Sequence, residues 1–297
     1  MFFAKQIVRT IKWKLHVIKK NAILIYMFRM PWRNTMRIAD LKEQISLITK
    51  LVKNDLKSRY SGSAFGMVWA YVQPLVTVLV FWYVFQVGFK NPPVDNIEYI
   101  LWFIAGYIPW IYFNDSVLAS TNVFYEYSYL VMKMKFKVWQ LPIIKVLSSL
   151  CIHMFFILFI IAMYFLYGYT FQLSWISILY YSFCITTLLF GLSFFVASLS
   201  VFIKDASQMV GIILQIGFWL TPIFWSDNSM NENVLHILKF NPLYYVINGY
   251  RDALISGIGF WHQPLYMTAY FWGCVVIVIL IGAKVYNNLK GHFADLL

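Results

Sequence analysis

Long apolar runs separated by short polar segments fill the chain from about residue 61 onward. An α-helix rises about 1.5 Å per residue and the hydrocarbon core of a bilayer is roughly 30 Å thick, so about 20 apolar residues make one crossing. Six runs reach or approach that length, over residues 65–89, 97–125, 141–167, 175–203, 209–225 and 265–285. The fifth is the shortest, with Pro222 near its end. The pattern predicts an all-α integral membrane protein with six transmembrane helices.

Residues 1–60 form a basic segment ahead of this membrane domain, 61–297. Apolar residues recur in it with helical spacing, and Lys and Arg occupy the other faces. A basic amphipathic helix beside a span most often lies in the lipid headgroup region, and docking on a cytoplasmic partner is a compatible alternative. We therefore expect two interfacial helices. The first carries Ile7, Ile11, Leu15, Ile18, Ala22 and Ile25, and the second carries Ile38, Leu41, Ile45, Ile48, Leu51 and Leu56.

The segment between the fifth and sixth runs, 227–264, is too polar to cross the membrane. It nevertheless contains two stretches with helical apolar spacing, 234–240 and 243–258, interrupted by Asn241 and Pro242. We interpret them as two short re-entrant helices, which are tolerable at membrane depth only where protein or water surrounds them.

Composition agrees with a membrane protein, and the charge distribution indicates its orientation. Of 297 residues, 61% are hydrophobic and 12% charged, against roughly 45–50% and about 25% in soluble domains. The net charge is +12, but the basic residues gather beside the spans, which argues against nucleic acid as a partner. An even number of spans puts both termini on the same side of the membrane, and the positive-inside rule makes that side cytoplasmic. The basic residues of the loops and tail on that side are Lys133, Lys135, Lys137, Lys204, Lys284 and Lys290.

The sequence carries no visible motif for catalysis. Cys151, Cys184 and Cys274 lie inside apolar runs without the spacing of a metal site or disulfide framework. The Gly-x-x-x-x-Gly-Lys-Ser/Thr phosphate loop is absent. We predict that the chain is not an enzyme and holds no metal or cofactor, and that energy comes from another subunit or from an ion gradient.

An ion-coupled carrier usually places ionisable residues near mid-membrane. The candidates here are Asp115, His153 and Lys145, of which Lys145 lies near an interface and can snorkel. His153 fits a hydrogen-bonded packing residue. Asp115 is the better functional candidate, because an isolated carboxylate that faces lipid is costly. An equally good interpretation is a structural one, in which Asp115 faces the interior of the bundle and neighbouring side chains satisfy its carboxylate.

The junction before the first run reads DLKSRYSGSAFGMVWAYVQPL, residues 55–75. It resembles the entrance motif of the permease subunit of ABC type-2 polysaccharide exporters, which move O-antigens, capsules and teichoic acids. Phe65 and Gln73 replace the family's usual Leu and Asn, and Ala70 stands where many teichoic-acid permeases have Glu. The residues in step with the family are Asp55, Leu56, Lys57, Arg59, Tyr60, Gly62, Ser63, Gly66, Trp69 and Pro74.

The resemblance continues in order to the C-terminus. It takes in Asn122, Leu130, Lys133, Phe136 and Pro142 after the second run, Asp205 after the fourth, Thr221, Pro222, Ile223 and Phe224 at the end of the fifth, and Asn241, Pro242, Leu243, Gly249 and Arg251 beyond it. It implies a homodimer with two cytoplasmic ABC ATPase subunits, which would bind ATP and Mg²⁺, in a bacterial plasma membrane. Pro222, Asn241, Pro242 and Arg251 would belong to an external gate.

The family likeness also assigns a role to the loop 125–140. It would form a coupling helix seated in a cleft of the ATPase, with Lys133, Lys135, Phe136, Lys137 and Trp139 as contacts and Asp205 in the neighbouring loop. A loop that merely fixes topology would explain the lysines but not Phe136 and Trp139.

Aromatic residues make up 20% of the chain, and many lie at membrane depth rather than at the interfaces. A flat ring with a polar tip suits the apolar face of a sugar and lets a polymer slide without a fixed register. Ordinary packing is the competing explanation for any single ring. The expected path residues are Trp69, Tyr71, Trp82, Tyr83, Tyr107, Trp110, Tyr112 and Trp219, together with Asp115.

These features favour the membrane subunit of an ATP-driven exporter of a lipid-linked glycan. Three other functions stay open. An ABC type-2 exporter of lipids or drugs would differ in what stimulates ATP hydrolysis. An ion-coupled carrier would need more membrane acids, and a membrane enzyme acting on polyprenyl-linked sugars would need clustered carboxylates or histidines.

Overall fold

The computed structural model describes residues 38–59, 61–90, 93, 97–132, 136–226 and 231–297. Contacts divide the chain into two compact units, Met1–Lys50 and Leu51–Leu297. Helix α2, Ile38–Ser58, begins in the first unit and ends in the second, and it covers the second predicted interfacial helix. The first predicted helix, over residues 7–25, lies outside the described residues.

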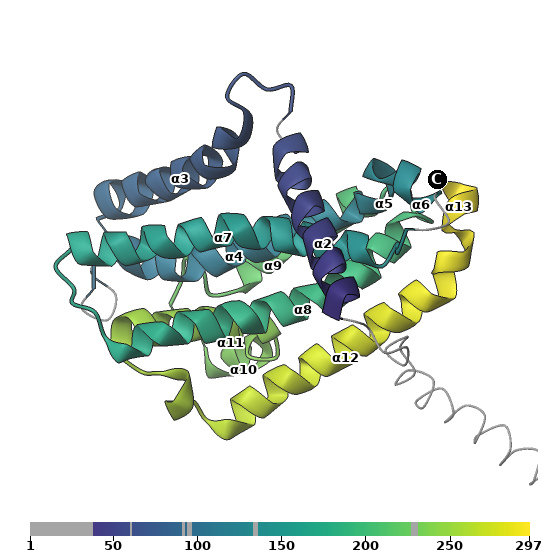
Figure 1. Ribbon diagram of the computed structural model, residues 1–297. Helices are drawn as coiled ribbons and strands as arrows, with labels where there is room; N and C mark the ends of the chain where they lie inside the picture. The colour runs from purple at the N-terminus through teal and green to yellow at the C-terminus, as the bar shows by residue number, and fades with distance from the viewer. Residues whose placement is uncertain (1–37, 60, 91–92, 94–96, 133–135, 227–230) are drawn as a thin grey trace, which may run out of the picture. The chain divides into compact units, whose positions relative to one another are not determined.

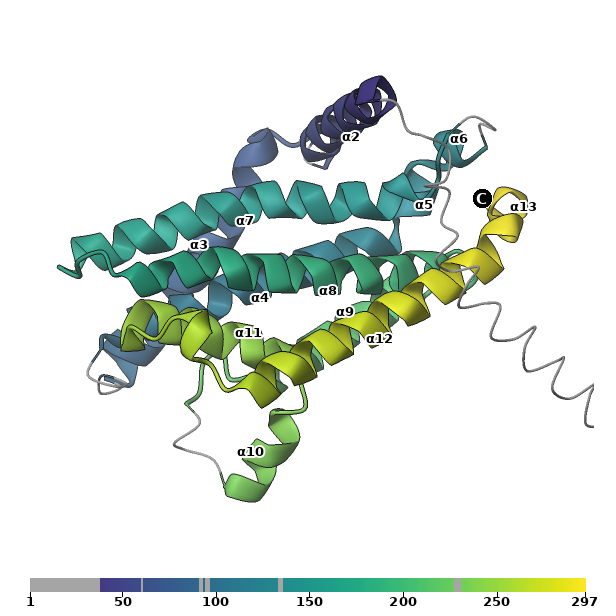
Figure 2. The ribbon, with the colours of Figure 1, turned by 60° about the horizontal axis from the view of Figure 1, so that its bottom comes forward.

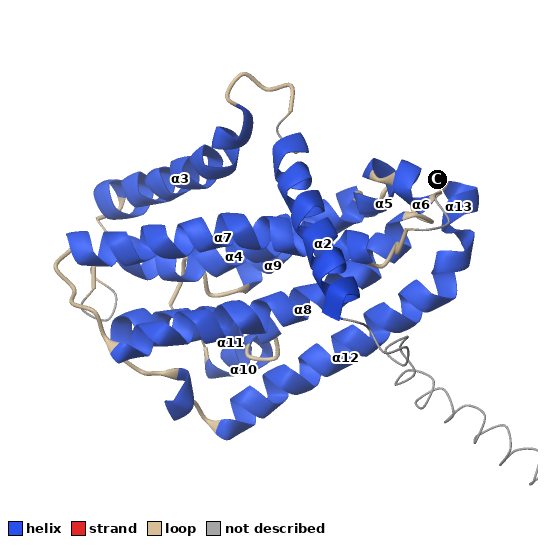
Figure 3. Ribbon diagram, in the orientation of Figure 1, coloured by secondary structure: helices blue, strands red, loops and turns tan. Residues whose placement is uncertain are grey.

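All the elements of the described residues are helices (Figure 3). A 3-10 turn, Gly66–Val68, leads into α3, Trp69–Phe81, which a π-helical stretch, Trp82–Gly88, extends. Next come α4, Tyr99–Thr121, the single turns α5, Val123–Glu126, and α6, Ser128–Val131, then α7, Gln140–Leu166. The 3-10 turn Leu173–Ile176 precedes α8, Ser177–Ser200, and α9 covers Ala206–Leu220. The remainder holds α10, Glu232–Leu238, α11, Pro242–Arg251, its π-helical extension Asp252–Ser256, α12, Leu265–Leu289, and α13, Phe293–Leu296.

Four helical stretches of the described residues are long and apolar enough to cross a membrane: Gly66–Gly88, Gln140–Leu166, Leu173–Ser200 and Leu265–Leu296. They coincide with the first, third, fourth and sixth predicted runs. The second run forms α4, whose 23 residues include Asn114 and Asp115. The fifth forms α9, whose 15 residues give a length of about 22 Å, less than the hydrocarbon thickness. The total of six spans therefore stays a prediction.

Helix α4 lies at the centre of the second unit. Its side chains from Leu101 to Ile108 are almost all buried, packed against α7, α8 and α11 (Figures 1 and 2). A helix surrounded by protein can carry polar residues that a lipid-facing helix could not. The outer faces of α7 and α12 are apolar instead, with Leu158 68% and Leu265 82% exposed, which is typical of surfaces that meet a membrane.

Two glycines let α8 and α12 approach closely. A Cβ atom added to Gly282 of α12 would lie 2.2 Å from the backbone oxygen of Gly191 on α8, and one added to Gly191 would lie 2.8 Å from the backbone nitrogen of Ile279. Small residues at such crossings bring helix backbones together in membrane proteins. The pairing of the last long helix with the bundle therefore depends on both positions lacking a side chain.

Different helices meet at the two ends of the bundle (Figures 1 and 2). At the charged end, as we call it, α4 and α8 end, α7 begins, and α5, α6 and α13 lie together. At the α11 end, α4 and α12 begin and α11 packs against α4 and α8. Helices α10 and α11 confirm the two short helices predicted between the fifth and sixth runs. Asn241 caps α11, because its side chain accepts a 3.0 Å hydrogen bond from the Leu243 N–H, and Pro242 follows as the first helical residue.

Candidate functional site

A cavity of about 180 Å³ lies between α3, α4 and α7. Pro74 of α3 forms part of its wall, and because proline has no N–H, the carbonyl of Ala70, also in the wall, lacks its usual helical partner. Trp69, Tyr107, Trp110, Tyr112 and Asp115, five of the expected path residues, line the cavity. Its other polar groups come from Gln73, Thr77, Asn114, Ser149 and His153. The result is a cavity with both aromatic faces and hydrogen-bonding groups.

His153 is one of the most buried polar residues that line this cavity. It is 2% exposed, and its ring stacks on Tyr112 with 4.6 Å between centroids. Its Nε2 atom lies 2.9 Å from the hydroxyl of Tyr250 on α11, so the packing role predicted for His153 is confirmed. Its Nδ1 atom, however, has no hydrogen-bond partner among the described residues. One ring nitrogen therefore holds α11, and the other is a buried polar atom without a partner among the described residues.

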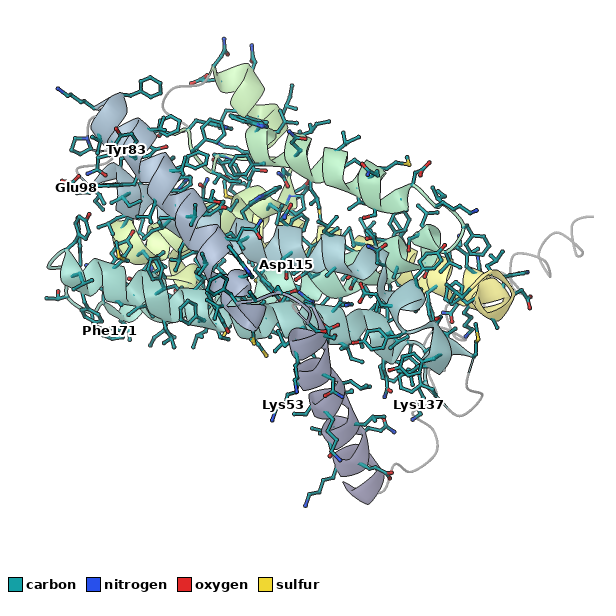
Figure 4. The ribbon with its side chains drawn as sticks, turned by 90° about the horizontal axis from the view of Figure 1, so that it is seen from above. Lys53, Tyr83, Glu98, Asp115, Lys137 and Phe171 are labelled. Carbon is teal, nitrogen blue, oxygen red and sulfur yellow. The ribbon has the colours of Figure 1, made fainter. Side chains whose placement is uncertain are left out.

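Asp115 joins this cavity to the charged end. Arg59 donates from Nε to Asp55 Oδ2 and from Nη1 to Asp115 Oδ2, both at 2.9 Å. Ser149 also donates its hydroxyl to Asp115. Asp115 thus faces the bundle interior and is satisfied by neighbours, as one of the two interpretations predicted, while its side chain remains 38% exposed. Figure 4 shows it beside the junction between α2 and α3.

Asp55 and Lys145 form the buried centre of the same network. Lys145 Nζ lies 2.6 Å from Asp55 Oδ1 and also pairs with Glu126 of α5. Asp55 is 0% exposed and also accepts a 2.9 Å hydrogen bond from the Tyr127 hydroxyl. Burial alone would raise the pKa of Asp55, but the charges of Arg59 and Lys145 outweigh it and hold that pKa below its usual value. We call Asp55, Arg59, Asp115, Glu126 and Lys145 the charged cluster.

The position predicted for the Lys145 side chain from the sequence is wrong. An interfacial lysine was expected to snorkel toward water, whereas the side chain is 1% exposed and points into the bundle. Its two carboxylate partners lie 90 and 19 residues away in the sequence. The available signal was a lysine close to the start of an apolar run that also contains Ser148, Ser149 and His153, which indicates a helix face turned inward.

The two loops expected to meet the ATPase lie at the charged end. The Tyr125 hydroxyl donates to the backbone oxygens of Ser200 and Val201, at 3.3 and 3.1 Å, which ties the loop after α4 to the end of α8. Lys133 and Lys135 lie outside the described residues. Lys137 (Figure 4), Trp139 and Asp205 are exposed, and Phe136 is half-buried.

Four of the expected path residues lie outside the cavity. Tyr71 packs on Phe155 of α7, with 4.5 Å between ring centroids. Trp82 and Tyr83 are exposed on the π-helical extension of α3, and Figure 4 shows Tyr83 near Glu98, away from Asp115. Trp219 of α9 is 56% exposed. The cavity therefore gathers the first part of α3 and the middle of α4, with α7 beside them.

The remaining residues of the entrance motif differ in their surroundings. Pro74 borders the cavity, Lys57 is exposed, and Gly66 has a φ of +52°, which a glycine adopts without strain. Tyr60 lies outside the described residues.

The residues expected at an external gate lie at the α11 end. The Arg251 guanidinium stacks 3.6 Å from the Trp102 ring centre and donates to the backbone oxygen of Ile223 at 2.8 Å. Asn241 Nδ2 donates to Thr221 Oγ1 at 3.0 Å, next to the buried Pro222. These contacts join the end of α9 to α4 and α11.

Within the described ranges, no three His, Cys, Asp or Glu side chains gather as metal ligands would.

Comparison with known proteins finds a matching family and relatives of similar length. The sequence profile of the ABC-2 type transporter family matches residues 46–255. An O-antigen export system permease protein RfbA of Klebsiella pneumoniae is 28% identical over 256 residues, covering 84% of this chain and 95% of the relative. Another protein of that name, from Myxococcus xanthus, is 24% identical over 262 residues, covering 87% of this chain and 98% of the relative.

Proposed function

The chain belongs to the ABC-2 type transporter family, and from that premise we propose that it is the membrane subunit of an ATP-driven exporter of a lipid-linked polysaccharide. The cargo would be an O-antigen, capsule or teichoic-acid-like polymer, moved from the cytoplasm across the bacterial plasma membrane. The names of the relatives, O-antigen export permeases, support this class of cargo. Two copies of the chain would work with two ABC ATPase subunits, which bind ATP and Mg²⁺.

The observation that carries the proposal is the mixed character of the cavity between α3, α4 and α7. Sugars present apolar C–H faces to aromatic rings and hydroxyl groups to amides, carboxylates and imidazoles. The cavity offers both kinds of partner, with Trp69 and Trp110 beside Gln73, Asn114 and His153. A lipid tail or an apolar drug would leave these polar groups without partners, which is unfavourable in a membrane.

The proposed topology places the charged end in the cytoplasm and the α11 end outside. Helices α4 and α9 would complete six spans, since α4 is enclosed by other helices and a short α9 can be accommodated by local thinning of the bilayer. Helices α10 and α11 would cap the exit as re-entrant helices. The buried side chains of α11, such as Ile247 and Tyr250, fit a helix surrounded by protein.

The charged cluster would transmit the movement that ATP hydrolysis drives. Glu126 of the coupling segment pairs with Lys145, Lys145 pairs with Asp55, and Asp55 pairs with Arg59. Arg59 then pairs with Asp115 in the cavity wall. A displacement of the coupling segment would therefore reach the cavity through four direct ion pairs rather than through loosely packed side chains.

Replacing Trp69 by alanine is expected to slow polysaccharide export about 3- to 10-fold, the effect of losing one aromatic contact. Trp69 is 42% exposed, so little packing is lost. The measurement is the surface polysaccharide that accumulates in the host strain at equal protein level. Trp261→Ala is the matched control, because Trp261 is 46% exposed and lines neither cavity described here. Equal export by both variants would contradict a glycan contact in this cavity.

A second candidate, an ABC type-2 exporter of lipids or drugs, is favoured by family membership alone. It would show ATP hydrolysis that responds to the apolar cargo and not to the glycan. An ion-coupled carrier is disfavoured because Asp115, its best candidate site, is already paired with Arg59 and Ser149.

A further inference from the structure

A larger cavity, of about 410 Å³, lies at the α11 end. Trp102 from the first turn of α4 forms one wall, Asn248 and Asp252 of α11 and its extension form another, and Gln263 and Met267 at the start of α12 close a third. Its volume falls in the range of about 300–1,000 Å³ that is usual for small-molecule sites. None of the path residues expected from the sequence lies in it.

The polar residues that line this cavity are two amides, one carboxylate, four hydroxyls and one guanidinium: Asn248, Gln263, Asp252, Ser226, Ser256, Tyr244, Tyr245 and Arg251. Gln263 donates from Nε2 to Asp252 Oδ2 at 2.6 Å, which fixes the side chains of both residues. The side-chain amide of Asn248, which is half-buried, makes no hydrogen bond to another described residue. An amide offers a donor and an acceptor a short distance apart, and this pattern matches two neighbouring hydroxyl groups of a sugar ring.

The aromatic part of the cavity is held rigidly. Trp102 is 3% exposed, and the Arg251 guanidinium lies on its ring at 3.6 Å. Arg251 also donates to backbone oxygens of Trp102 and Ile223, so its role is to fix the wall. Tyr244 and Tyr245 add further ring surface. Rigid aromatic surface beside the Asn248 amide favours a saccharide over a lipid chain, which would leave that amide without a partner.

We propose that this cavity is an external saccharide subsite that holds sugar residues of the polymer after they leave the bundle. The proposal rests on the proposed function, because it takes the α11 end as external and the cargo as a glycan. Weak binding outside the membrane would lower the chance that the emerging polymer slides back, and so would favour outward movement during each cycle.

The two cavities share helix α11. Asn248, which lines the external subsite, lies two residues before Tyr250, whose hydroxyl meets His153 Nε2 in the wall of the first cavity. Ser182 of α8 also lies 2.6 Å from that hydroxyl. The position of α11 therefore depends on a contact inside the first cavity, and occupancy of one cavity would affect the shape of the other.

The test uses the complete complex of permease and ATPase in lipid nanodiscs. The probe is the delipidated oligosaccharide released from the host's surface polymer, at millimolar concentration, and saturation-transfer NMR reports its contact with the protein. In a Trp69→Ala background, which weakens the glycan contact of the first cavity, Asn248→Leu is expected to reduce the transfer signal at least five-fold, because leucine keeps the size of the side chain but offers no hydrogen bond. The matched control is Asn233→Leu, an exposed asparagine of α10 outside both cavities.

Separate outcomes distinguish the two proposals. If lipid-linked glycan stimulates ATP hydrolysis but the wild type gives no transfer signal, or Asn248→Leu leaves the signal of the Trp69→Ala background unchanged, the subsite is refuted and the exporter stands. If the glycan stimulates no hydrolysis even in the wild type, the exporter proposal fails first. Gln263→Leu provides a second variant should Asn248→Leu not fold, and an unchanged signal from it in the same background would equally overturn the subsite.

Discussion

Replacing Gly282 by valine is expected to abolish accumulation of the folded protein in the membrane. The first added carbon would lie 2.2 Å from the Gly191 backbone oxygen, far inside van der Waals contact. Overpacking a well-packed core costs about 1–3 kcal/mol when side chains can shift. Here the opposing atom is backbone, so the whole of α12 must move away from α8. The measurement is the yield of monodisperse protein after detergent extraction, followed by size-exclusion chromatography.

Gly273 supplies the control on the same helix. A Cβ atom added there meets nothing within 4 Å, so Gly273→Val introduces the same side chain without a clash and is expected to extract like the wild type. Gly191→Val is expected to behave like Gly282→Val, since it clashes with the backbone of Ile279. Normal extraction of Gly282→Val would show that α8 and α12 are not packed as described.

Replacing Lys145 by methionine is expected to lower the melting temperature of the purified protein by roughly 10 °C or more. The change leaves Asp55, which is fully buried, and Glu126 without their common cation. Removing one partner of a buried ion pair costs about 3–5 kcal/mol, because the other charge stays buried with less compensation, and Asp55 would keep Arg59 as its one cationic partner among the described residues. Melting followed by the loss of extractable monomer, at neutral pH, measures the effect.

A second substitution tests the cause. Asp55→Asn in the Lys145→Met background removes the buried charge, so the double variant is expected to melt well above Lys145→Met alone. The surface control is Lys284→Met on α12, where the lysine is exposed, and it is expected to melt like the wild type. Additive losses from Lys145→Met and Asp55→Asn would mean that the two residues do not act as a pair.

Much of the helical framework could be predicted from the sequence, because apolar length and Asn-Pro breaks are local signals. The runs 141–167 and 175–203 match Gln140–Leu166 and Leu173–Ser200 within a few residues. The division between α10 and α11 follows from Asn241 and Pro242, which cap and begin α11. The number of crossings does not follow from these local signals, because the depth of a helix in the membrane depends on what surrounds it, as for α4.

The charged cluster could not be predicted in the same way, because pairing depends on tertiary contacts. Arg59 and Asp115 are 56 residues apart in the sequence, and Lys145 and Asp55 are 90 apart. Each looks like an independent charge until the helices are packed. The aromatic residues show the converse problem. Trp69 and Trp82 have the same residue type on one continuous helical stretch, yet only Trp69 lines the cavity, since sequence spacing does not show which part of that stretch α4 and α7 meet.

The most direct test of the account is to purify the tagged chain from its native membranes in mild detergent, identify the proteins that accompany it, and measure ATP hydrolysis with and without lipid-linked glycan. We predict a stoichiometric ABC ATPase subunit whose hydrolysis the glycan stimulates, and loss of that stimulation in Phe136→Asp, which places a charge in the coupling loop. If the chain purifies alone and the preparation shows no ATP hydrolysis, with or without the glycan, the exporter proposal is contradicted, and Asp115 becomes the first residue to test for ion coupling.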